Sequence, residues 1–535
     1  MNKMQLTLIL FAGLLVCGCM SNEAVRNDYF KDNTTKPCAW PEWGSYSDKG
    51  ETVFSNLPDD LKLRDPKKLP LLEPSQTPCI SHFIEKHPMK KVYQDDFLLG
   101  VAEFDDLGQP YNRSMMDRVI KMVEEQVDKG PVSLVIFVHG WRHNAAVWDD
   151  NVKTFRRILE KNVEHEHEIH PNQPRKVVGV YIGYRGKSLT GGGIPVLGDS
   201  WEALSIQDRR FAAERVAIRS VREFLSALKA IELQANNPMN DRCGQHPRVA
   251  SGEAGAMRST AKPVPGQREQ QEQCVHMLII AHSLGAQIVF DAISGFYLDQ
   301  LAIAERARDD HRRCDTNEYC RIRIDPYGNL VVFINPAFEG ARFLPLYSAS
   351  RGKLFQPEQK PVLISITADN DWVTGLAFHV FRSIGTFFQG EIDPIEGQSN
   401  VTAVGHFDCY RTHALWLAES WNKLSDEKSR EVHELNCDLT GVAGSVEQSP
   451  TPAGPSHFLE HYRKGGDQWQ FGSKSTTVLL ERIPQSQLNT PFWFITSYSP
   501  EILDEHSRFE DKPLTDFLTE LYFDVSGDEY SSQKE

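Results

Sequence analysis

A serine between an apolar run and a helix-like pattern is the residue of this chain best placed for nucleophilic chemistry. Residues 277–281 are apolar and predict a buried strand, and a helical apolar periodicity begins directly after Ser283. A sharp turn between strand and helix strains such a serine and exposes its Oγ above the sheet. The turn needs small residues two positions away on each side. Gly285 fits this requirement, and Ala281 stands where glycine is usual, so we expect Ser283 to be a nucleophile.

A serine nucleophile needs a base that takes its proton and an acid that orients the base. When the serine lies in such a turn, the acid follows it along the chain and the histidine comes last. Asp369 and Asp371 follow the strand-like run 361–367, and the Asp-Trp-Val spacing favours Asp371. His506 follows the last strand-like run and precedes the closing helix, so its position favours it as the base. The alternative bases are two histidines inside a long insertion, His406 and His413.

Backbone amides must stabilise the negative charge that develops when a serine attacks a carbonyl group. The residue after the nucleophile, Leu284, supplies one such N–H. The strand-like run 132–138 ends in His139-Gly140-Trp141, where Gly140 permits a turn and the Trp141 N–H is the expected second donor. We expect His139 to orient this loop through a side-chain hydrogen bond rather than to take part in the chemistry.

Strand-like and helix-like segments alternate, which indicates an α/β fold with a mostly parallel sheet and helices on both faces. Continuous apolar runs are typical of strands buried on both faces. The predicted strands are residues 96–104, 132–138, 177–182, 277–281, 330–334, 361–367 and 491–497, and the main predicted helices are residues 112–129, 147–159, 208–233 and 514–521.

These elements predict one domain over residues 95–525, interrupted by insertions at about 234–273 and 375–488. Loops at such positions can form lids and substrate walls. Residues 20–94 lack a clear periodicity and predict an irregular tether that wraps the domain, and residues 526–535 form a polar tail.

The first 19 residues have the pattern of a secretory signal. Lys3 precedes the apolar run 6–16, which is too short for a stable membrane span. The run ends in Val16-Cys17-Gly18-Cys19, which resembles a bacterial lipoprotein signal. The resemblance implies cleavage after Gly18 and acylation of Cys19, and two or more acyl chains anchor a protein stably. Met20 is not the aspartate that commonly retains lipoproteins at the inner membrane, which favours the outer membrane. A plain signal peptide cleaved nearby is the alternative.

Charge and cysteine content narrow the class of protein further. A net charge of −15 argues against a nucleic-acid binder, which would carry a basic face. Beyond the signal, eight cysteines form an even set that suits disulfides in an oxidising compartment. Cys314 could pair with Cys320, and Cys409 with Cys437. No Cys-x-x-Cys pair is present, so we expect no structural metal.

Two further features have alternative interpretations. Tyr184-Arg185-Gly186 follows a predicted strand, and Arg185 either lines a substrate cleft or, as we favour, pairs with an acid. An aromatic group forms either an acyl pocket or lid, or a helix packed on the core: Trp372, Phe378, Phe381, Phe387 and Phe388.

The segments FVHGWRHNA, GVYIGYRG, IIAHSLGA, ITADNDWVT and EHSRF together resemble esterase-like serine hydrolases of the α/β-hydrolase superfamily. The resemblance covers roughly residues 95–522, with both insertions poorly matched. It implies that Ser283, His506 and Asp371 form a catalytic triad that acts through an acyl-enzyme, without metal or cofactor.

The implied substrate is a small-molecule or lipid carboxylic ester, met by a protein anchored through Cys19 in the bacterial envelope, facing the periplasm or the exterior. Thioesterase, amidase and acyltransferase activities use the same triad. A non-enzymatic, membrane-anchored binding protein on this scaffold is the alternative from another class.

Overall fold

The computed structural model describes the greater part of the region predicted to be the folded domain. The described residues are 18–19, 24–26, 38–39, 82–89, 95–186, 189–190, 209–237, 273–310, 321–356, 359–386, 394–419, 468–471, 477–483, 486, 489–506 and 512–526. Within these ranges, no helix combines the length and the apolar character needed to cross a membrane.

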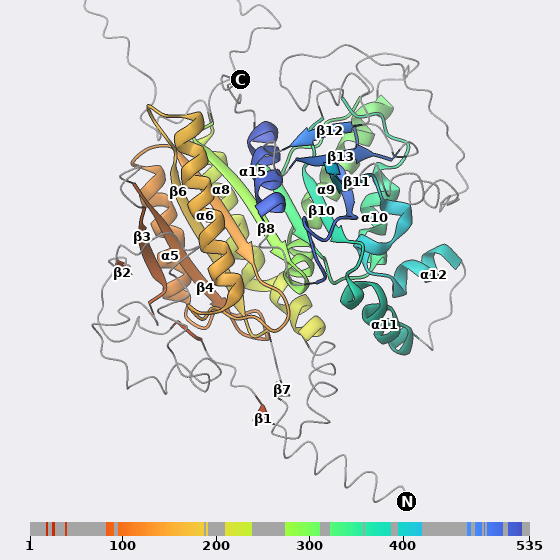
Figure 1. The fold of residues 1–535 in the computed structure, drawn as a ribbon, viewed down its shortest axis with the longest axis horizontal. Coiled ribbons are helices and arrows are strands. Elements are labelled where there is room, and N and C mark those ends of the chain that lie inside the picture. Colours follow the sequence, from red (N-terminus) through yellow and green to blue (C-terminus); the bar gives the residue numbers. More distant parts are fainter. Residues whose placement is uncertain are drawn as a thin grey trace, which may run out of the picture.

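A mixed, mostly parallel sheet of twelve strands forms the centre of the structure (Figure 1). Eight neighbouring strands are parallel, and in spatial order they are β11 (His413–Leu417), β14 (Phe492–Ser497), β10 (Leu363–Ala368), β9 (Leu330–Ile334), β8 (Val275–His282), β5 (Val132–Val138), β6 (Lys176–Tyr184) and β4 (Asp96–Phe104). Every residue of the central strands β5, β8 and β9 is buried, because helices cover both faces of the sheet. The α/β architecture predicted from the sequence is therefore confirmed.

The sheet divides the hydrophobic core into two layers, and helices cover each layer. One face of the sheet packs against α5 (Arg113–Val127), α8 (Arg222–Ala235), α9 (Leu284–Asp310) and α10 (Gly340–Ser350). The other face packs against α6 (Asp150–Ile169) and α15 (Lys512–Ser526). The helix over residues 209–216 leads into the segment η2 (Ala217–Val221), where the backbone is kinked at Arg219 before α8 begins. Side-chain caps at Asn112 and Asp149 begin α5 and α6, as expected for polar residues that satisfy the first backbone N–H groups of a helix.

The sheet also contains strands from the segments that were predicted to be the tether and the second insertion. β3 (Ile84–Pro88) pairs antiparallel with β4 and carries β2 (Cys38–Ala39) at its outer edge. β13 (Val478–Arg482) pairs antiparallel with β11, and β12 (Gln468–Phe471) with β13. These short strands lack a continuous apolar run, because each lies at or near an edge of the sheet. The second insertion also contributes η5 (Val373–Ala377), α11 (Phe378–Thr386) and α12 (Pro394–Val401).

Much of the predicted signal, tether, first insertion and tail lies outside the described residues. Gly18–Cys19 (β1) pairs antiparallel with Leu189–Thr190 (β7). Cys274 and Cys409 are each disulfide-bonded, whereas Cys314, Cys320 and Cys437 fall outside the described part.

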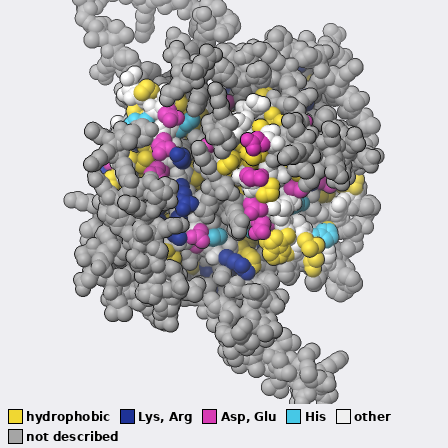
Figure 2. Space-filling view, in the orientation of Figure 1, with side chains coloured by type: hydrophobic (Ala, Val, Ile, Leu, Met, Phe, Trp, Pro, Cys, Tyr) yellow, Lys and Arg dark blue, Asp and Glu magenta, His cyan; other side chains and the backbone are white. Residues whose placement is uncertain are grey.

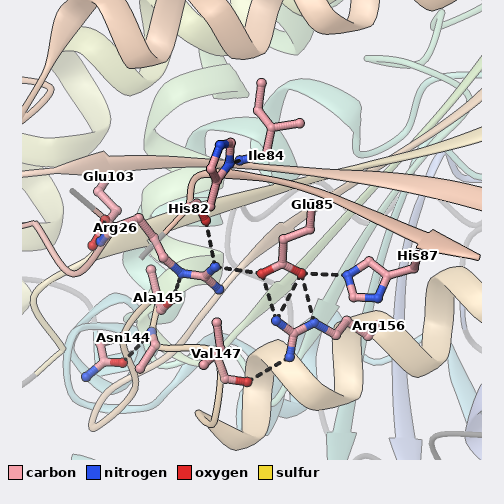
Figure 3. A network of polar contacts seen from close by, with 11 residues as sticks. Arg26, His82, Ile84, Glu85, His87, Glu103, Asn144, Ala145, Val147 and Arg156 are labelled. Carbon is pink, nitrogen blue, oxygen red and sulfur yellow. Dashed lines mark hydrogen bonds and ion pairs between the residues drawn. The ribbon is translucent and has the colours of Figure 1, made fainter. Parts of the chain in front are cut away.

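The short segment 24–26 is fastened into the body of the protein by buried ionic contacts. The Arg26 guanidinium donates to Glu85 Oε1 at 2.6 Å, and Arg156 approaches the same carboxylate from α6 at 2.8 Å (Figure 3). Both guanidinium groups and Glu85 are fully buried. Burial alone would raise the pKa of Glu85, but the two arginines hold it well below its usual range.

The backbone of the same segment is held by a second buried carboxylate. The N–H groups of Val25 and Arg26 donate to the two oxygens of Glu103, at 2.9 and 2.8 Å. Arg26 Nε also donates to the carbonyl oxygen of Ala145, at 2.6 Å. Because Ala145 belongs to the loop after β5 and Glu103 lies at the end of β4, this segment reaches the carboxyl edge of the parallel strands.

Candidate active site

The turn between β8 and α9 holds Ser283 in a strained conformation. Ser283 has a φ of 55°, in the left-handed region that non-glycine residues seldom adopt. Its N–H donates to the Ile334 carbonyl at 3.0 Å, and its own carbonyl accepts from Ala337 N–H at 3.1 Å. A Cβ at Gly285 would lie 2.3 Å from the carbonyl oxygen of Val138, so only glycine fits where the helix passes β5.

The three residues predicted to form a triad lie in one hydrogen-bonded chain. His506 Nε2 lies 2.7 Å from Ser283 Oγ, and His506 Nδ1 lies 2.8 Å from Asp371 Oδ2. Because an ionised carboxylate can only accept, Nδ1 donates to Asp371 and leaves Nε2 to accept the Ser283 hydroxyl. All three residues are at most 8% exposed. The structure thus brings together side chains that are separated by 223 and 135 positions in the sequence.

The Asp371 carboxylate is held in its charged form. Val373 N–H and Thr374 N–H donate to Oδ1, and the Thr374 hydroxyl donates to Oδ2. Burial opposes ionisation, but His506 and these donors outweigh it and lower the pKa of Asp371 to about 2. The carboxylate can therefore orient His506 throughout the neutral pH range.

The loop that carries His506 is fixed through its backbone. Asn335, at the end of β9, donates from Nδ2 to the carbonyl oxygens of Glu505 and His506, at 2.8 and 3.0 Å. Its Oδ1 accepts from Ala368 N–H at 2.9 Å, so one side chain joins β9, β10 and this loop. His282 Nε2 lies 2.8 Å from the His506 carbonyl oxygen and donates to it. Burial lowers the pKa of His282 well below its usual value, so its imidazole is neutral.

The turn after β10 makes a second connection to the same loop. Asn370 Nδ2 donates to Asp504 at 2.8 Å, and Asn370 Oδ1 accepts from Glu505 N–H at 3.1 Å. The acid turn and the base loop are therefore joined by their own side chains as well as by the bond between Asp371 and His506.

The alternative acid and bases occupy other places. Asp369 is exposed, and its N–H donates to the Ser497 carbonyl. His406 Nε2 lies 3.0 Å from Thr374 Oγ1, which puts this imidazole behind the acid rather than beside Ser283. His413 is buried in β11, and burial lowers its pKa to about 3. Of the two aspartates and three histidines that the sequence left open as partners, Asp371 and His506 form the hydrogen-bonded chain with Ser283.

The loop after β5 lies directly against the nucleophile. A Cβ at Gly140 would be 2.7 Å from Ser283 Cβ, so glycine allows the two turns to touch. Tyr184 N–H donates to His139 Nε2 at 3.0 Å, which leaves His139 Nδ1 to donate to the Gly140 carbonyl at 2.9 Å. The ring also stacks on Tyr184, and burial lowers the pKa of His139 to about 4.

Two backbone amides in this region were predicted to bind an oxyanion. Leu284 is the first residue of α9, so its N–H has no acceptor within the helix. Trp141 follows Gly140, and the Arg142 guanidinium covers its ring at 4.3 Å from the centroid. Arg142 has a φ of 71° and donates its N–H to the Gly186 carbonyl, which fixes the end of the loop.

The two other candidates from the sequence are Arg185 and the aromatic group. Arg185 forms an ion pair with Asp106, which Arg209 also contacts at 3.0 Å. Phe378 is buried under the Arg210 guanidinium, whereas Trp372 is 61% exposed. The aromatic group therefore divides between core and surface. The side chains of its other members, Phe381, Phe387 and Phe388, are outside the described part.

Three residues of the site were not predicted: Asn335, Thr374 and His282. Asn335 directly follows the apolar run of β9 and has a φ of 45°. Asparagine adopts this left-handed conformation more readily than most residues, so an asparagine directly after a buried strand could have indicated a tight turn there. Thr374 stands three residues after Asp371, the spacing of a side chain that closes a turn. Nothing in the sequence marks His282 as a donor to a loop 224 residues away.

The parts of the chain described here hold no group of three or more His, Cys, Asp or Glu residues arranged to bind a metal ion. Comparisons with protein-family models, with curated proteins and with solved structures found no match to this chain.

Proposed function

We propose that this protein is a serine hydrolase of the α/β-hydrolase fold that cleaves carboxylic esters through an acyl-enzyme intermediate. The observation that carries the proposal is the hydrogen-bonded chain from Ser283 through His506 to Asp371. Its support is the strained strand–turn–helix that holds Ser283 at the carboxyl edge of a parallel sheet.

In the proposed reaction, Ser283 Oγ attacks the carbonyl carbon of the ester while His506 Nε2 takes the hydroxyl proton. The developing oxyanion is stabilised by the N–H groups of Leu284 and Trp141. When the C–O bond breaks, His506 returns the proton to the departing alkoxide. Water then attacks the acyl-enzyme with His506 as base, and Ser283 is regenerated with release of the acid.

Asp371 keeps its negative charge through the cycle and stabilises the imidazolium that forms at His506. Asn335 and His282 hold the backbone of the His506 loop, and His139 holds the loop of Gly140. The same arrangement would serve thioesters, amides and acyl transfer, and the choice among them depends on the substrate groups that reach Ser283.

Hydrolysis of p-nitrophenyl acyl esters tests the proposal. Ser283→Ala and His506→Ala should each lower kcat/KM by about 10³-fold or more. His406→Ala is the matched control, because His406 lies behind Asp371 and does not touch Ser283. Equal activity of wild type and Ser283→Ala would refute the proposal, and a loss confined to His406→Ala would move the base to that residue.

We further propose that the mature protein is acylated at Cys19 and held at the bacterial envelope. The lipoprotein-like signal supports this, and the disulfide-bonded Cys274 and Cys409 suit an oxidising compartment. Radiolabelled palmitate should enter the wild type and be absent from Cys19→Ala. Equal labelling of both forms would exclude this anchor.

A further inference from the structure

Exposed apolar side chains are concentrated at one edge of the described structure. Among the described residues, eight large hydrophobic side chains are at least 48% exposed, and six of them lie at this edge. The other two, Leu233 and Ile303, lie near the C-terminal ends of α8 and α9, at the amino edge of the parallel strands. The six lie on segments at the carboxyl edge, and we call them the apolar edge: Leu107, Phe211, Ile218, Trp372, Leu376 and Val380.

Three of the six residues of the apolar edge come directly after Asp371 in the sequence. Trp372 adjoins Asp371, and Leu376 and Val380 follow at intervals of four, which places the three on one side of η5 and α11. They are 61%, 68% and 48% exposed, whereas Thr374 and Phe378 between them are buried. Figure 2 shows hydrophobic side chains gathered over α11. An apolar stripe therefore borders the candidate active site.

The other half adjoins this stripe through contacts between elements. Phe211 and Ile218 are seven positions apart on one helical stretch, and Leu107 lies in the loop after β4. Ser220 N–H donates to the Gly108 carbonyl at 3.1 Å, which joins that loop to the helical stretch. Arg210 lies 5.5 Å from the ring centroid of Phe378, which joins the stretch to α11.

The proposed anchor emerges at the same edge. Cys19 pairs through its backbone with Leu189, five positions beyond the carboxyl end of β6, and Arg26 is fixed to the loop after β5. Seven positions separate Cys19 from Arg26, a span of at most about 25 Å for an extended chain. Cys19 therefore lies on the same side of the molecule as the apolar edge, where Figure 1 places β1, β7 and α11.

We infer that the apolar edge docks on a lipid bilayer, so that Ser283 faces the membrane in which Cys19 is anchored. The inference rests on the proposed lipid anchor and deepens the proposed function by assigning acyl lipids of that membrane as the substrate class. Apolar side chains on one face of a surface element gain by leaving water for the boundary between headgroups and acyl chains. Leu233 and Ile303 remain in water, because they lie at the opposite edge.

Flotation with vesicles of phosphatidylethanolamine and phosphatidylglycerol tests the inference without the anchor. The chain truncated after Cys19, residues 20–535, lacks the acylated cysteine and should float with the vesicles. Leu376→Glu with Val380→Glu should lower its partition coefficient by about tenfold or more, because each side chain leaves the apolar boundary. The matched control carries Leu233→Glu with Ile303→Glu, two apolar residues of similar exposure, and should float like the wild type.

Fluorophosphonate labelling of the same samples separates this inference from the proposed function. Flotation with the expected variant pattern but no labelling would uphold the docking edge and refute the hydrolase. Absence of flotation in a labelled wild type, or equal losses in both double variants, would overturn the docking edge. A wild-type dimer that Leu376→Glu with Val380→Glu makes monomeric, without any effect of vesicles, would overturn it in favour of a second copy of the chain.

Discussion

At the scale of single residues, the site depends on which atoms can donate and which can only accept. The Asp371 carboxylate accepts from Val373, Thr374 and His506, so it fixes the tautomer that leaves His506 Nε2 facing Ser283. A neutral amide at this position would present an N–H group where an acceptor is needed.

Asp371→Asn should therefore lower the rate of ester hydrolysis by about 10³–10⁴-fold while the fold is retained. Because the pKa of Asp371 is about 2, the wild type should not lose activity through this residue as the pH falls from 8 towards about 4. Asp369→Asn is the matched control, since Asp369 is exposed two positions away, and it should keep the wild-type rate. A wild-type rate in Asp371→Asn would contradict the assigned role.

At the scale of elements, the residues of the site lie at the ends of parallel strands. Asn335 connects the ends of β9 and β10 with the loop of His506. Its side chain satisfies two carbonyl oxygens of the His506 loop and one N–H at the end of β10. Asn329 at the other end of β9 makes a comparable bond, accepting from Met277 N–H at 2.8 Å. Both asparagines stabilise the fold, but only Asn335 also holds the loop of His506. Comparing substitutions at the two positions therefore distinguishes an effect on stability from an effect on the site.

Asn335→Ala should lower the free energy of unfolding by about 2–4 kcal/mol, because buried backbone groups lose their partners. It should also lower kcat with little change in KM, since the loop of His506 loses its fixed position. Asn329→Ala should reduce stability and leave kcat unchanged. Urea unfolding and ester kinetics measure both effects, and equal kcat values in the two variants would show that Asn335 has only a structural role.

The central elements were predictable from the sequence because they lie in the middle of the sheet. Residues 96–104, 132–138 and 330–334 are mostly apolar, and the structure has strands with the same bounds. The order of Ser283, Asp371 and His506 along the chain was also sufficient to select residues that the fold brings together.

The edge strands and the supporting residues were not predictable by the same means. β3 contains the buried Glu85, which pairs with arginines from distant segments, and His87, which pairs with Glu85, so its pattern is not that of an apolar strand. β11 enters the sheet out of chain order, which periodicity does not report. Asn335 acts through contacts with backbone groups, and those depend on tertiary structure rather than on local sequence.

At the scale of the whole molecule, residues 24–26 of the predicted tether are held against the folded domain by buried contacts. Arg26 and Arg156 share the buried Glu85, and the backbone of Val25 and Arg26 is held by Glu103. Burial raises the pKa of Glu103 from its ordinary value of 4.5 to about 7, against the hydrogen bonds that it accepts.

A raised pKa gives a defined sign to the pH dependence of stability. The folded protein binds the Glu103 proton more tightly than the unfolded chain does, so stability falls as pH rises from about 4.5 to about 7. This contribution is on the order of 3 kcal/mol. Glu103→Gln should remove it, so the difference in unfolding free energy between variant and wild type should change across this range. A difference that is constant with pH would contradict the shift.

The most direct test of the central claim is to map the site of fluorophosphonate labelling by mass spectrometry of peptides from the mature protein. We predict a single adduct on the peptide that contains Ser283, formed at a rate that His506→Ala and Asp371→Asn reduce strongly. A folded wild type that forms no adduct, or an adduct on another serine with Ser283 unmodified, would contradict the claim that Ser283 is an activated nucleophile.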